Sequence, residues 1–242
     1  MNYGWLKAQP WWKKGPALIE DGNTVSHVYF RNGALVDTKG LSWAMQGTVP
    51  QVGAGSIAGA SKTPPSAGPF SDSNYYSLGT GNDVLDFTGD FYCTVVYKLT
   101  TLSQCALFEN GVFGASGEGY ILYDIGDSTV FFDTNGPSSA ITRNALSPGS
   151  TTGVVQVLSG GRTGSGANQL AKFNLQTVNS MATPQTTAGT NTQARIGRTS
   201  SVANQYVRGV IYEVLWTSTA ASDAAFVSQA TAVKAKYGIT AW

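Results

Sequence analysis

The stretch YVRGVIYEVLW, residues 206–216, carries β-branched or aromatic side chains at most of its positions. Side chains of this kind fit the pleated, largely buried surface of a strand inside a sheet. The stretch FYCTVVYKL, residues 91–99, has the same character. The two stretches therefore predict long β-strands, and the first of them a central one.

Shorter runs of the same kind recur along the chain at spacings of roughly 8–20 residues, with Gly or Asn near most of their boundaries. No helical crossover separates one run from the next, so we expect antiparallel sheets and no alternating β–α–β units. The runs are residues 25–30, 41–46, 75–78, 84–87, 104–109, 120–125, 129–133, 154–158, 170–175 and 194–196.

One helix is predicted near the end of the chain, over residues 222–237. Ser222 or Asp223 can cap its N-terminus, and Gly238 can end it in the left-handed conformation that glycine adopts easily. Apolar side chains recur at helical spacing and so share one face. These are Phe226, Ala230, Val233 and Tyr237.

Two motifs resemble the laminin-G-like, concanavalin A-like jelly-roll family. The family's entry motif is similar to SNYYSLGTGNDVLDFTGDFYCTVVYKL, residues 73–99. Its ending, a strand with a glutamate, a turn and a short helix closing on KYG, is similar to residues 207–239. The resemblance covers about residues 25–240 and implies an all-β fold of two stacked antiparallel sheets. It does not fix a function, because lectins, adhesion modules, glycanases and virion proteins share this fold.

The chain divides into two parts of unequal size. Residues 1–24 form a distinct arm, in which Pro10 and Pro16 argue against a continuous helix. Residues 25–242 form the jelly-roll domain. Within it, residues 53–69 are rich in Gly, Ala, Ser and Pro, and predict a loop excursion.

The composition excludes several partners. The net charge is +1 and only 12% of residues are charged, so no basic field exists to hold a nucleic acid. No apolar run approaches the roughly 18–20 residues that span a bilayer, and the first residues lack the apolar core of a secretory leader. The single histidine, His27, excludes a multi-histidine metal site and is better interpreted as a structural residue.

The motifs of catalysis are absent from the sequence. Glycanases of this fold carry carboxylates in an E-x-D-x-x-E pattern, which places an acid and a nucleophile side by side. The glutamates of this chain do not occur in that pattern, and no G-x-S-x-G elbow is present. We therefore expect no enzyme activity, no catalytic residue and no cofactor. The glutamates are Glu20, Glu109, Glu118 and Glu213.

Several aspartates could hold Ca²⁺ in loops, as in many laminin-G-like modules. Turn chemistry also explains their positions, and spacing cannot show whether about six oxygens converge on one point. We expect no resident metal. The candidates are Asp83, Asp86 and Asp90, or Asp124 and Asp127.

The two cysteines, Cys93 and Cys105, lie on predicted strands 91–99 and 104–109. If these strands form a hairpin around residues 100–102, Cys93 faces a position near residue 109. The two sulfur atoms are then not opposite one another, so we expect two buried free thiols.

The arm is the least ordinary part of the sequence. Trp5, Trp11 and Trp12 lie beside Lys13 and Lys14, and each tryptophan can bury about 150–250 Å². The arm could fill a groove of its own sandwich. We prefer the interpretation that these five side chains bind a partner, with tryptophan anchors and a lysine rim.

Three functions follow, of decreasing weight. The first is a non-catalytic structural protein of a tailed-phage virion, a capsid decoration (cement) protein or a tail or fibre component. It would be assembled in the host cytoplasm, and would form homo-oligomers and bind major capsid or tail proteins through its arm. The second is a carbohydrate-binding or adhesion module for host-surface glycans, with aromatic side chains that stack on sugars. The third and weakest is a glycan hydrolase. The aromatic candidates are Trp43, Tyr75, Tyr76, Tyr123 and Tyr206.

Overall fold

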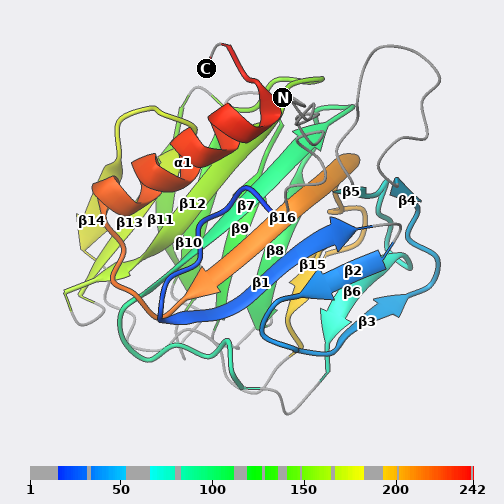
Figure 1. The fold of residues 1–242 in the computed structure, drawn as a ribbon, viewed down its shortest axis with the longest axis horizontal. Coiled ribbons are helices and arrows are strands. Elements are labelled where there is room, and N and C mark those ends of the chain that lie inside the picture. Colours follow the sequence, from blue (N-terminus) through cyan, green and yellow to red (C-terminus); the bar gives the residue numbers. More distant parts are fainter. Residues whose placement is uncertain are drawn as a thin grey trace, which may run out of the picture.

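The computed structural model shows an all-β protein in which two antiparallel sheets are stacked face to face, with one helix on the outside (Figure 1). The prediction of a two-sheet antiparallel sandwich is confirmed. The structure describes residues 16–31, 34–52, 66–79, 83–111, 119–126, 129–135, 141–147, 149–164, 167–182, 193–200, 202–240 and 242.

The first sheet, sheet A, has nine strands among the described residues. Residues 91–99 and 206–216 supply two neighbouring strands in the middle of this sheet, because both stretches are apolar on both faces. Two further strands, β4 (Gln51–Val52) and β5 (Ser66–Ala67), extend from β16. The main order is β14 (Asn179–Ala182), β13 (Asn168–Phe173), β12 (Gln156–Thr163), β7 (Phe91–Leu99), β16 (Gly209–Thr217), β1 (Thr24–Arg31) and β2 (Ala34–Asp37).

The second sheet, sheet B, has seven strands among the described residues and lies behind sheet A in Figure 1. The chain passes between the two sheets several times, and β8 to β11 follow one another within sheet B. The order is β11 (Ile141–Leu146), β10 (Val130–Asn135), β9 (Gly119–Asp124), β8 (Cys105–Gly111), β15 (Arg195–Ile196), β6 (Tyr75–Leu78) and β3 (Trp43–Gln46).

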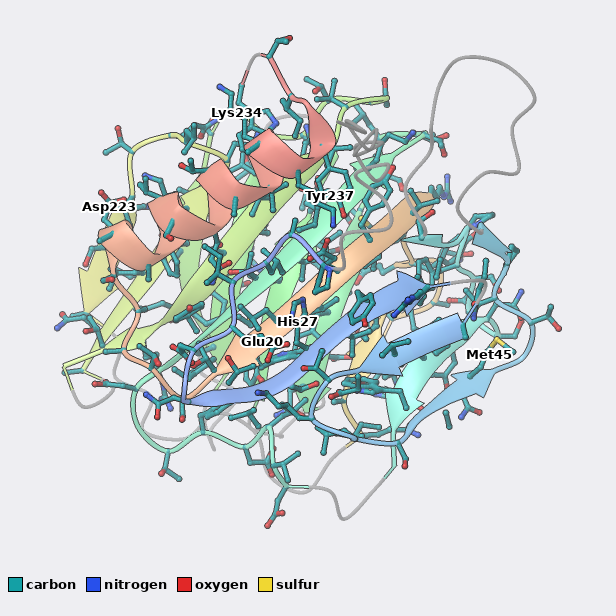
Figure 2. The ribbon with its side chains drawn as sticks, in the orientation of Figure 1. Glu20, His27, Met45, Asp223, Lys234 and Tyr237 are labelled. Carbon is teal, nitrogen blue, oxygen red and sulfur yellow. The ribbon has the colours of Figure 1, made fainter. Side chains whose placement is uncertain are left out.

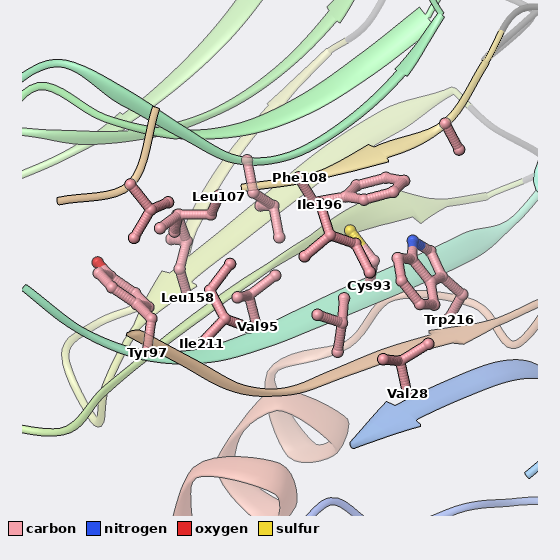
Figure 3. Packing of buried hydrophobic residues seen from close by; sticks show 14 of the residues in the cluster. Val28, Cys93, Val95, Tyr97, Leu107, Phe108, Leu158, Ile196, Ile211 and Trp216 are labelled. Atoms are coloured by element: carbon pink, nitrogen blue, oxygen red, sulfur yellow. The ribbon is translucent and has the colours of Figure 1, made fainter. Parts of the chain in front are cut away.

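The main core fills the space between the two sheets (Figure 3). Trp216 of β16 packs edge-on against Phe108 of β8, with ring centroids 4.7 Å apart. Phe91 packs against Phe87 and Tyr120 at 4.6 and 4.8 Å. Full burial of one such side chain contributes about 1.5–3 kcal/mol, so this aromatic layer holds the two sheets together.

A second, smaller core lies on the outer face of sheet A, under helix α1 (Asp223–Tyr237). The helix buries Phe226, Ala230 and Val233, the face that the sequence predicts. Its ends are also as predicted, because Ser222 Oγ accepts from the Ala225 N–H and Gly238 adopts the left-handed conformation.

Residues 17–20 cross the same outer face, beside the helix, and we call them the strap. The side-chain amide of Gln229 in α1 makes two hydrogen bonds to the backbone of the strap. Its Oε1 accepts from the Ile19 N–H at 2.7 Å, and its Nε2 donates to the Ile19 carbonyl at 2.9 Å. Strap and helix together bury this face of sheet A.

Two of the predictions about strands are wrong. Residues 84–87 form a turn and an isolated bridge, with Val84 exposed and Leu85 buried, so they are not a strand. Strands β7 and β8 do not form a hairpin either, because β7 pairs with β12 and β16 in sheet A and β8 with β9 and β15 in sheet B. The connection at residues 100–104 passes from one sheet to the other.

The prediction of two free, buried thiols is confirmed, for a different reason from the one expected. Cys93 lies opposite Gly160 and Trp216 in sheet A, and Cys105 lies opposite Asp124 in sheet B. Burial raises the pKa of both thiols well above the ordinary value. Both sulfur atoms therefore belong to the core and are poor nucleophiles.

Candidate functional site

The five partner-binding residues predicted in the arm, Trp5, Trp11, Trp12, Lys13 and Lys14, lie outside the described residues. Most of the predicted loop excursion, residues 53–65, lies outside them too. The described remainder of that excursion begins with β5.

Four of the five aromatic candidates are committed to packing. Trp43 stacks on Trp216, with centroids 5.4 Å apart, and Tyr76 is 2% exposed. Tyr75 and Tyr206 are partly buried against the main core. The Arg198 guanidinium lies over the Tyr75 ring, 4.9 Å from its centroid. The Arg208 guanidinium lies over the Tyr206 ring, 5.5 Å from its centroid.

The fifth, Tyr123 of β9, lies on the outer face of sheet B. Its neighbours Tyr120 and Leu122 point into the core, so strand alternation turns Tyr123 outward. It pairs across the strands with Phe131 of β10, and the two rings stack at 6.4 Å and 28°. The structure thus assembles a ring pair on the outer face of sheet B, in which Tyr123 is partly exposed and Phe131 is 7% exposed. The sequence did not predict this pair.

Polar side chains surround this ring pair. The guanidinium of Arg143 lies 4.4 Å from the centroid of the Phe131 ring, and the Tyr123 hydroxyl lies 3.5 Å from Gln104 Oε1. Arg143 also donates from Nε to Oδ2 of Asp133 at 2.9 Å. We call these residues, Gln104, Tyr123, Phe131, Asp133 and Arg143, the sheet B patch.

Asp133 is the unusual member of the sheet B patch. Its side chain is 1% exposed, and its Oδ1 has no hydrogen-bond partner among the described residues. Burial raises its pKa from 3.8 to about 6, although Arg143 acts in the opposite direction. Both oxygens of this carboxylate are therefore buried beneath the patch, one on Arg143 and one without a partner among the described residues.

A row of cross-strand neighbours continues from Asp133 along the outer face of sheet B. The row crosses four neighbouring strands, from β10 through β9 and β8 to β15. Its members are, in order, Asp133, Ile121, Glu109 and Arg195. Glu109 is fully buried, and it accepts from the Ser200 hydroxyl at 2.9 Å and from the Ser200 backbone N–H. Arg195 Nη1 lies 3.8 Å from Glu109 Oε2, so the row contains two carboxylates, each with an arginine of its own.

An open groove borders the sheet B patch at β11. It lies between the end of β11 and the β13–β14 connection, with a cavity volume of about 510 Å³. Ala145 links groove and patch, because it lines the groove and also pairs with Phe131. The remaining walls are mostly polar and come from Leu146, Ser147, Gln176, Thr177, Val178 and Asn179.

The calcium candidates do not converge in the described part of the chain. Asp124 points into the core, where it accepts from the Tyr97 hydroxyl at 2.8 Å, from the Gly126 N–H at 2.7 Å and from the Ser150 hydroxyl. Asp86 accepts from Asn110. No group of three or more His, Cys, Asp or Glu suited to a metal occurs among the described residues, and Asp127 lies outside them.

The buried carboxylate of sheet A, Glu213, has a purely structural setting. The Ala17 N–H donates to both of its oxygens at 2.7 Å, and the Leu18 N–H and the Tyr237 hydroxyl donate at 2.8 and 2.7 Å. His27 Nε2 lies 3.6 Å away. Burial alone would raise the Glu213 pKa, but these partners lower it below 4.5.

His27 lies under the strap, next to Glu20 (Figure 2). It is fully buried, and its Nδ1 lies 3.0 Å from Glu20 Oε1, while Lys39 Nζ lies 3.0 Å from the other oxygen. The interpretation of His27 as a structural histidine agrees with these contacts.

None of the helices among the described residues is long and apolar enough to cross a membrane.

No family model matches the chain, and no curated protein matches it. Solved structures do share its fold. The binding domain of botulinum neurotoxin serotype G matches with a TM-score of 0.63 at 9% identity, over 86% of this chain and 51% of that one.

Two further structures carry a sugar in their names. The serotype D ligand binding domain in complex with N-acetylneuraminic acid matches with a TM-score of 0.65 at 10% identity, over 86% of this chain and 50% of that one. The binding domain of botulinum neurotoxin DC in complex with SialylT matches with a TM-score of 0.60 at 10% identity, over 88% and 52%. This chain thus shares a jelly-roll-like sandwich with binding domains, and it spans about half the length of each.

Proposed function

We propose that the protein is a non-catalytic glycan-binding module and that the sheet B patch is its binding site. The observation that carries this proposal is the stacked, outward-facing pair Tyr123–Phe131, with a buried carboxylate and an arginine beside it. The open groove lies next to this face, between the end of β11 and the β13–β14 connection of sheet A.

The chemistry of the patch suits a sugar. The faces of a sugar ring present C–H groups, which pack on aromatic rings, and its edge presents hydroxyls, which need donors and acceptors. Tyr123 offers the ring, Gln104 an amide, and Arg143 a guanidinium that is 49% exposed. Binding sites combine apolar or aromatic walls with a few polar groups that fix orientation, and the sheet B patch has both.

The similar structures add support of a general kind. One name describes a ligand binding domain in complex with N-acetylneuraminic acid, and another describes cell entry of botulinum neurotoxin type C through interaction with two ganglioside molecules. Because this chain corresponds to about half of each domain, the proposal for this chain rests on the patch itself.

The proposal is tested by glycan-array screening of the full chain, followed by calorimetric titration of the strongest glycan. We expect Tyr123→Ala to weaken binding about 5- to 150-fold, since loss of one stacked ring removes about 1–3 kcal/mol. The matched control is Tyr29→Ala, which removes a partly buried tyrosine from β1 of the other sheet. Absence of any glycan binding, or equal loss in both variants, would contradict the proposal.

A second candidate function rests on the sequence of the arm. We propose that Trp5, Trp11, Trp12, Lys13 and Lys14 join copies of this protein to one another or to capsid or tail proteins of a phage particle. The virion location stays a prediction. The two functions are compatible, because a virion surface module can also bind host glycans.

The structure changes how this second candidate is best tested. Deleting residues 1–24 would also remove the strap, whose Ala17 and Leu18 N–H groups bind buried Glu213. The better variant is the full chain with all three arm tryptophans changed to alanine. We expect light scattering to show an oligomer for the unchanged chain and a monomer for the variant. A monomer for both would contradict self-assembly through the arm.

A further inference from the structure

The groove beside β11 has the size and the wall chemistry of a binding site. Its volume of about 510 Å³ lies within the range of about 300–1,000 Å³ that small-molecule sites occupy. None of the described residues that line it is charged. Leu146 and Val178, which pack against the two cores, give it apolar surface. The groove therefore suits an uncharged group that carries both C–H surface and hydroxyls.

Three polar side chains of the groove have atoms left for a ligand. Ser147 and Thr177 are exposed, and their hydroxyls make no hydrogen bond to any described residue. Asn179 Nδ2 donates to the Ala145 carbonyl at 2.9 Å, which fixes the orientation of the amide. Its Oδ1 accepts from none of the described residues. Two hydroxyls and an amide oxygen are suitable partners for the hydroxyls of a sugar.

Cross-strand register connects the groove with the sheet B patch. Tyr123 of β9 pairs with Phe131 of β10, which pairs with Ala145 of β11, so the three residues form a row on the outer face. Neighbours in such a row have Cβ atoms about 4.5–5.5 Å apart, which puts Ala145 about 10 Å from Tyr123. Ala145 is exposed and lines the groove. A ligand that lies along this row therefore passes from the exposed ring into the groove.

Arg143 lies beside the middle of this row. Its guanidinium covers the Phe131 ring at 4.4 Å, and Nε is held by Asp133. The terminal nitrogens Nη1 and Nη2 make no hydrogen bond to any described residue, and the side chain is 49% exposed. The guanidinium is thus fixed in place with donors left over, which can bind oxygens of a ligand crossing from Tyr123 to Ala145.

Resting on the proposed function of the patch, we propose that the ligand is an oligosaccharide of at least three units, bound across the edge of sheet B. One unit packs on Tyr123. The next accepts hydrogen bonds from the terminal nitrogens of Arg143. A third enters the groove, where Ser147, Thr177 and Asn179 bind its hydroxyls.

The connection between the three positions sets the size of the expected effect. A ligand that already occupies the patch presents its next unit to the groove at a high effective concentration, so a contact that is weak by itself adds to the affinity. Linked contacts of this kind raise affinity by up to about 10²–10⁴. A sugar of two units gains nothing from the groove, because it ends at Arg143.

The test compares short with long sugars on the full chain. The array carries lactose, maltose and cellobiose, together with the tetrasaccharides lacto-N-neotetraose, maltotetraose and cellotetraose. Calorimetric titration then measures both lengths of each sugar that binds. We expect at least one tetrasaccharide to bind at least about tenfold more tightly than its disaccharide, because only the tetrasaccharide reaches the groove.

Two variants test whether the groove causes this difference. The double variant Ser147→Ala, Thr177→Ala removes both free hydroxyls, and Ala145→Ile narrows the passage with a side chain that suits a strand. Each should lower the affinity of the tetrasaccharide about tenfold and leave that of the disaccharide unchanged. Tyr123→Ala should weaken both sugars.

The matched control is the double variant Ser228→Ala, Thr231→Ala. It also removes one serine and one threonine hydroxyl from exposed positions, but these lie on α1, outside sheet A. Both sugars should bind this variant as they bind the unchanged protein. Near-ultraviolet circular dichroism checks the fold of all variants.

The contrary results separate the oligosaccharide site from the proposed function. Equal affinity for the two lengths of every sugar that binds, or a tetrasaccharide that binds both groove variants unchanged, would overturn the oligosaccharide site while the patch stands. Equal weakening of the disaccharide in the groove variants would overturn it too, since the short sugar would then lie in the groove. Binding of none of the six sugars would also overturn it, and absence of any glycan binding on the array would overturn both.

Discussion

Glu213 and Asp133 are the same kind of group in corresponding places, since each is a carboxylate buried on the outer face of its sheet. His27 lies beside Glu213, which also receives two backbone N–H groups and a tyrosine hydroxyl, and these partners lower its pKa against the effect of burial. Asp133 receives one arginine N–H, and its pKa rises to about 6. Since both carboxylates are buried, the partners around each of them, and not burial, set the opposite directions of the two pKa shifts.

The donors differ because the two faces are covered differently. On sheet A, α1 supplies Tyr237 and the strap supplies backbone N–H groups (Figure 2). In the described part of the chain, no helix covers the outer face of sheet B, which carries aromatic and charged side chains instead. Since Tyr123 and Arg143 keep exposed surface while Glu109 and Asp133 beside them are buried, we assign the candidate binding face to this part of sheet B.

The largest effect on stability is expected from Glu213→Ala. It leaves the Ala17 and Leu18 N–H groups and the Tyr237 hydroxyl without their acceptor inside the protein. We expect a loss of about 3–5 kcal/mol in the free energy of unfolding, measured by urea denaturation. A loss below about 1 kcal/mol would mean that the strap contributes little to folding.

The two carboxylates should also give opposite slopes of stability against pH. Asp133 keeps its proton in the folded protein up to about pH 6 but only to 3.8 when unfolded, so its contribution falls as the pH rises between these values. The unfolding free energy of Asp133→Asn minus that of the unchanged protein should therefore grow by about 2–3 kcal/mol from pH 4 to 7.

Glu213 has the reverse behaviour, because its folded pKa lies below 4.5. Its contribution is complete above that value and is lost as the pH falls below it. Glu213→Gln should thus be most destabilising at neutral pH and least at acid pH. Slopes of the same sign in the two variants would remove the distinction drawn here.

A smaller effect is expected from the cap of α1. Ser222→Ala removes the hydroxyl that accepts from the Ala225 N–H at 3.1 Å, and should cost about 1 kcal/mol. Since α1 covers only sheet A, glycan binding should be unchanged in this variant. Weaker glycan binding in calorimetric titration would show that the two faces are coupled.

The smallest effect on stability is expected from Tyr123→Ala. The ring packs on Phe131 on the outer face and takes no part in the main core. We expect a change below about 1 kcal/mol in urea denaturation, in contrast to its large effect on binding. A loss as large as that of Glu213→Ala would assign the ring pair to folding and not to a ligand.

The sequence predicts the sandwich well where a segment has one buried face or is buried on both. Residues 206–216 and 91–99 are apolar on both faces because α1 and the strap cover the outside of sheet A, and both are central strands. A strand that is apolar on both faces gives no pattern that shows which strand it pairs with. Periodicity could not show that β7 and β8 belong to different sheets, so the expected hairpin was wrong.

The candidate site is harder to predict than the fold. Tyr123 was one of five aromatic candidates, but Phe131, Asp133 and Arg143 were not singled out. They come from separate strands and meet only through cross-strand register. A signal was present in FFD, residues 131–133, where an aspartate shares a strand face with an aromatic ring two positions earlier. Its partners across the sheet could not be read from one sequence.

The most direct test of the account is to locate the sugar on the molecule. Backbone amide signals of the isotope-labelled full chain are followed by NMR during titration with the strongest glycan from the array. We predict that the shifting signals cluster on β9, β10 and β11, at Tyr123, Phe131, Asp133 and Arg143, while those of the strap and α1 stay in place. Shifts that cluster on the strap, on α1 or on sheet A away from the groove would contradict the assignment of sheet B as the binding face.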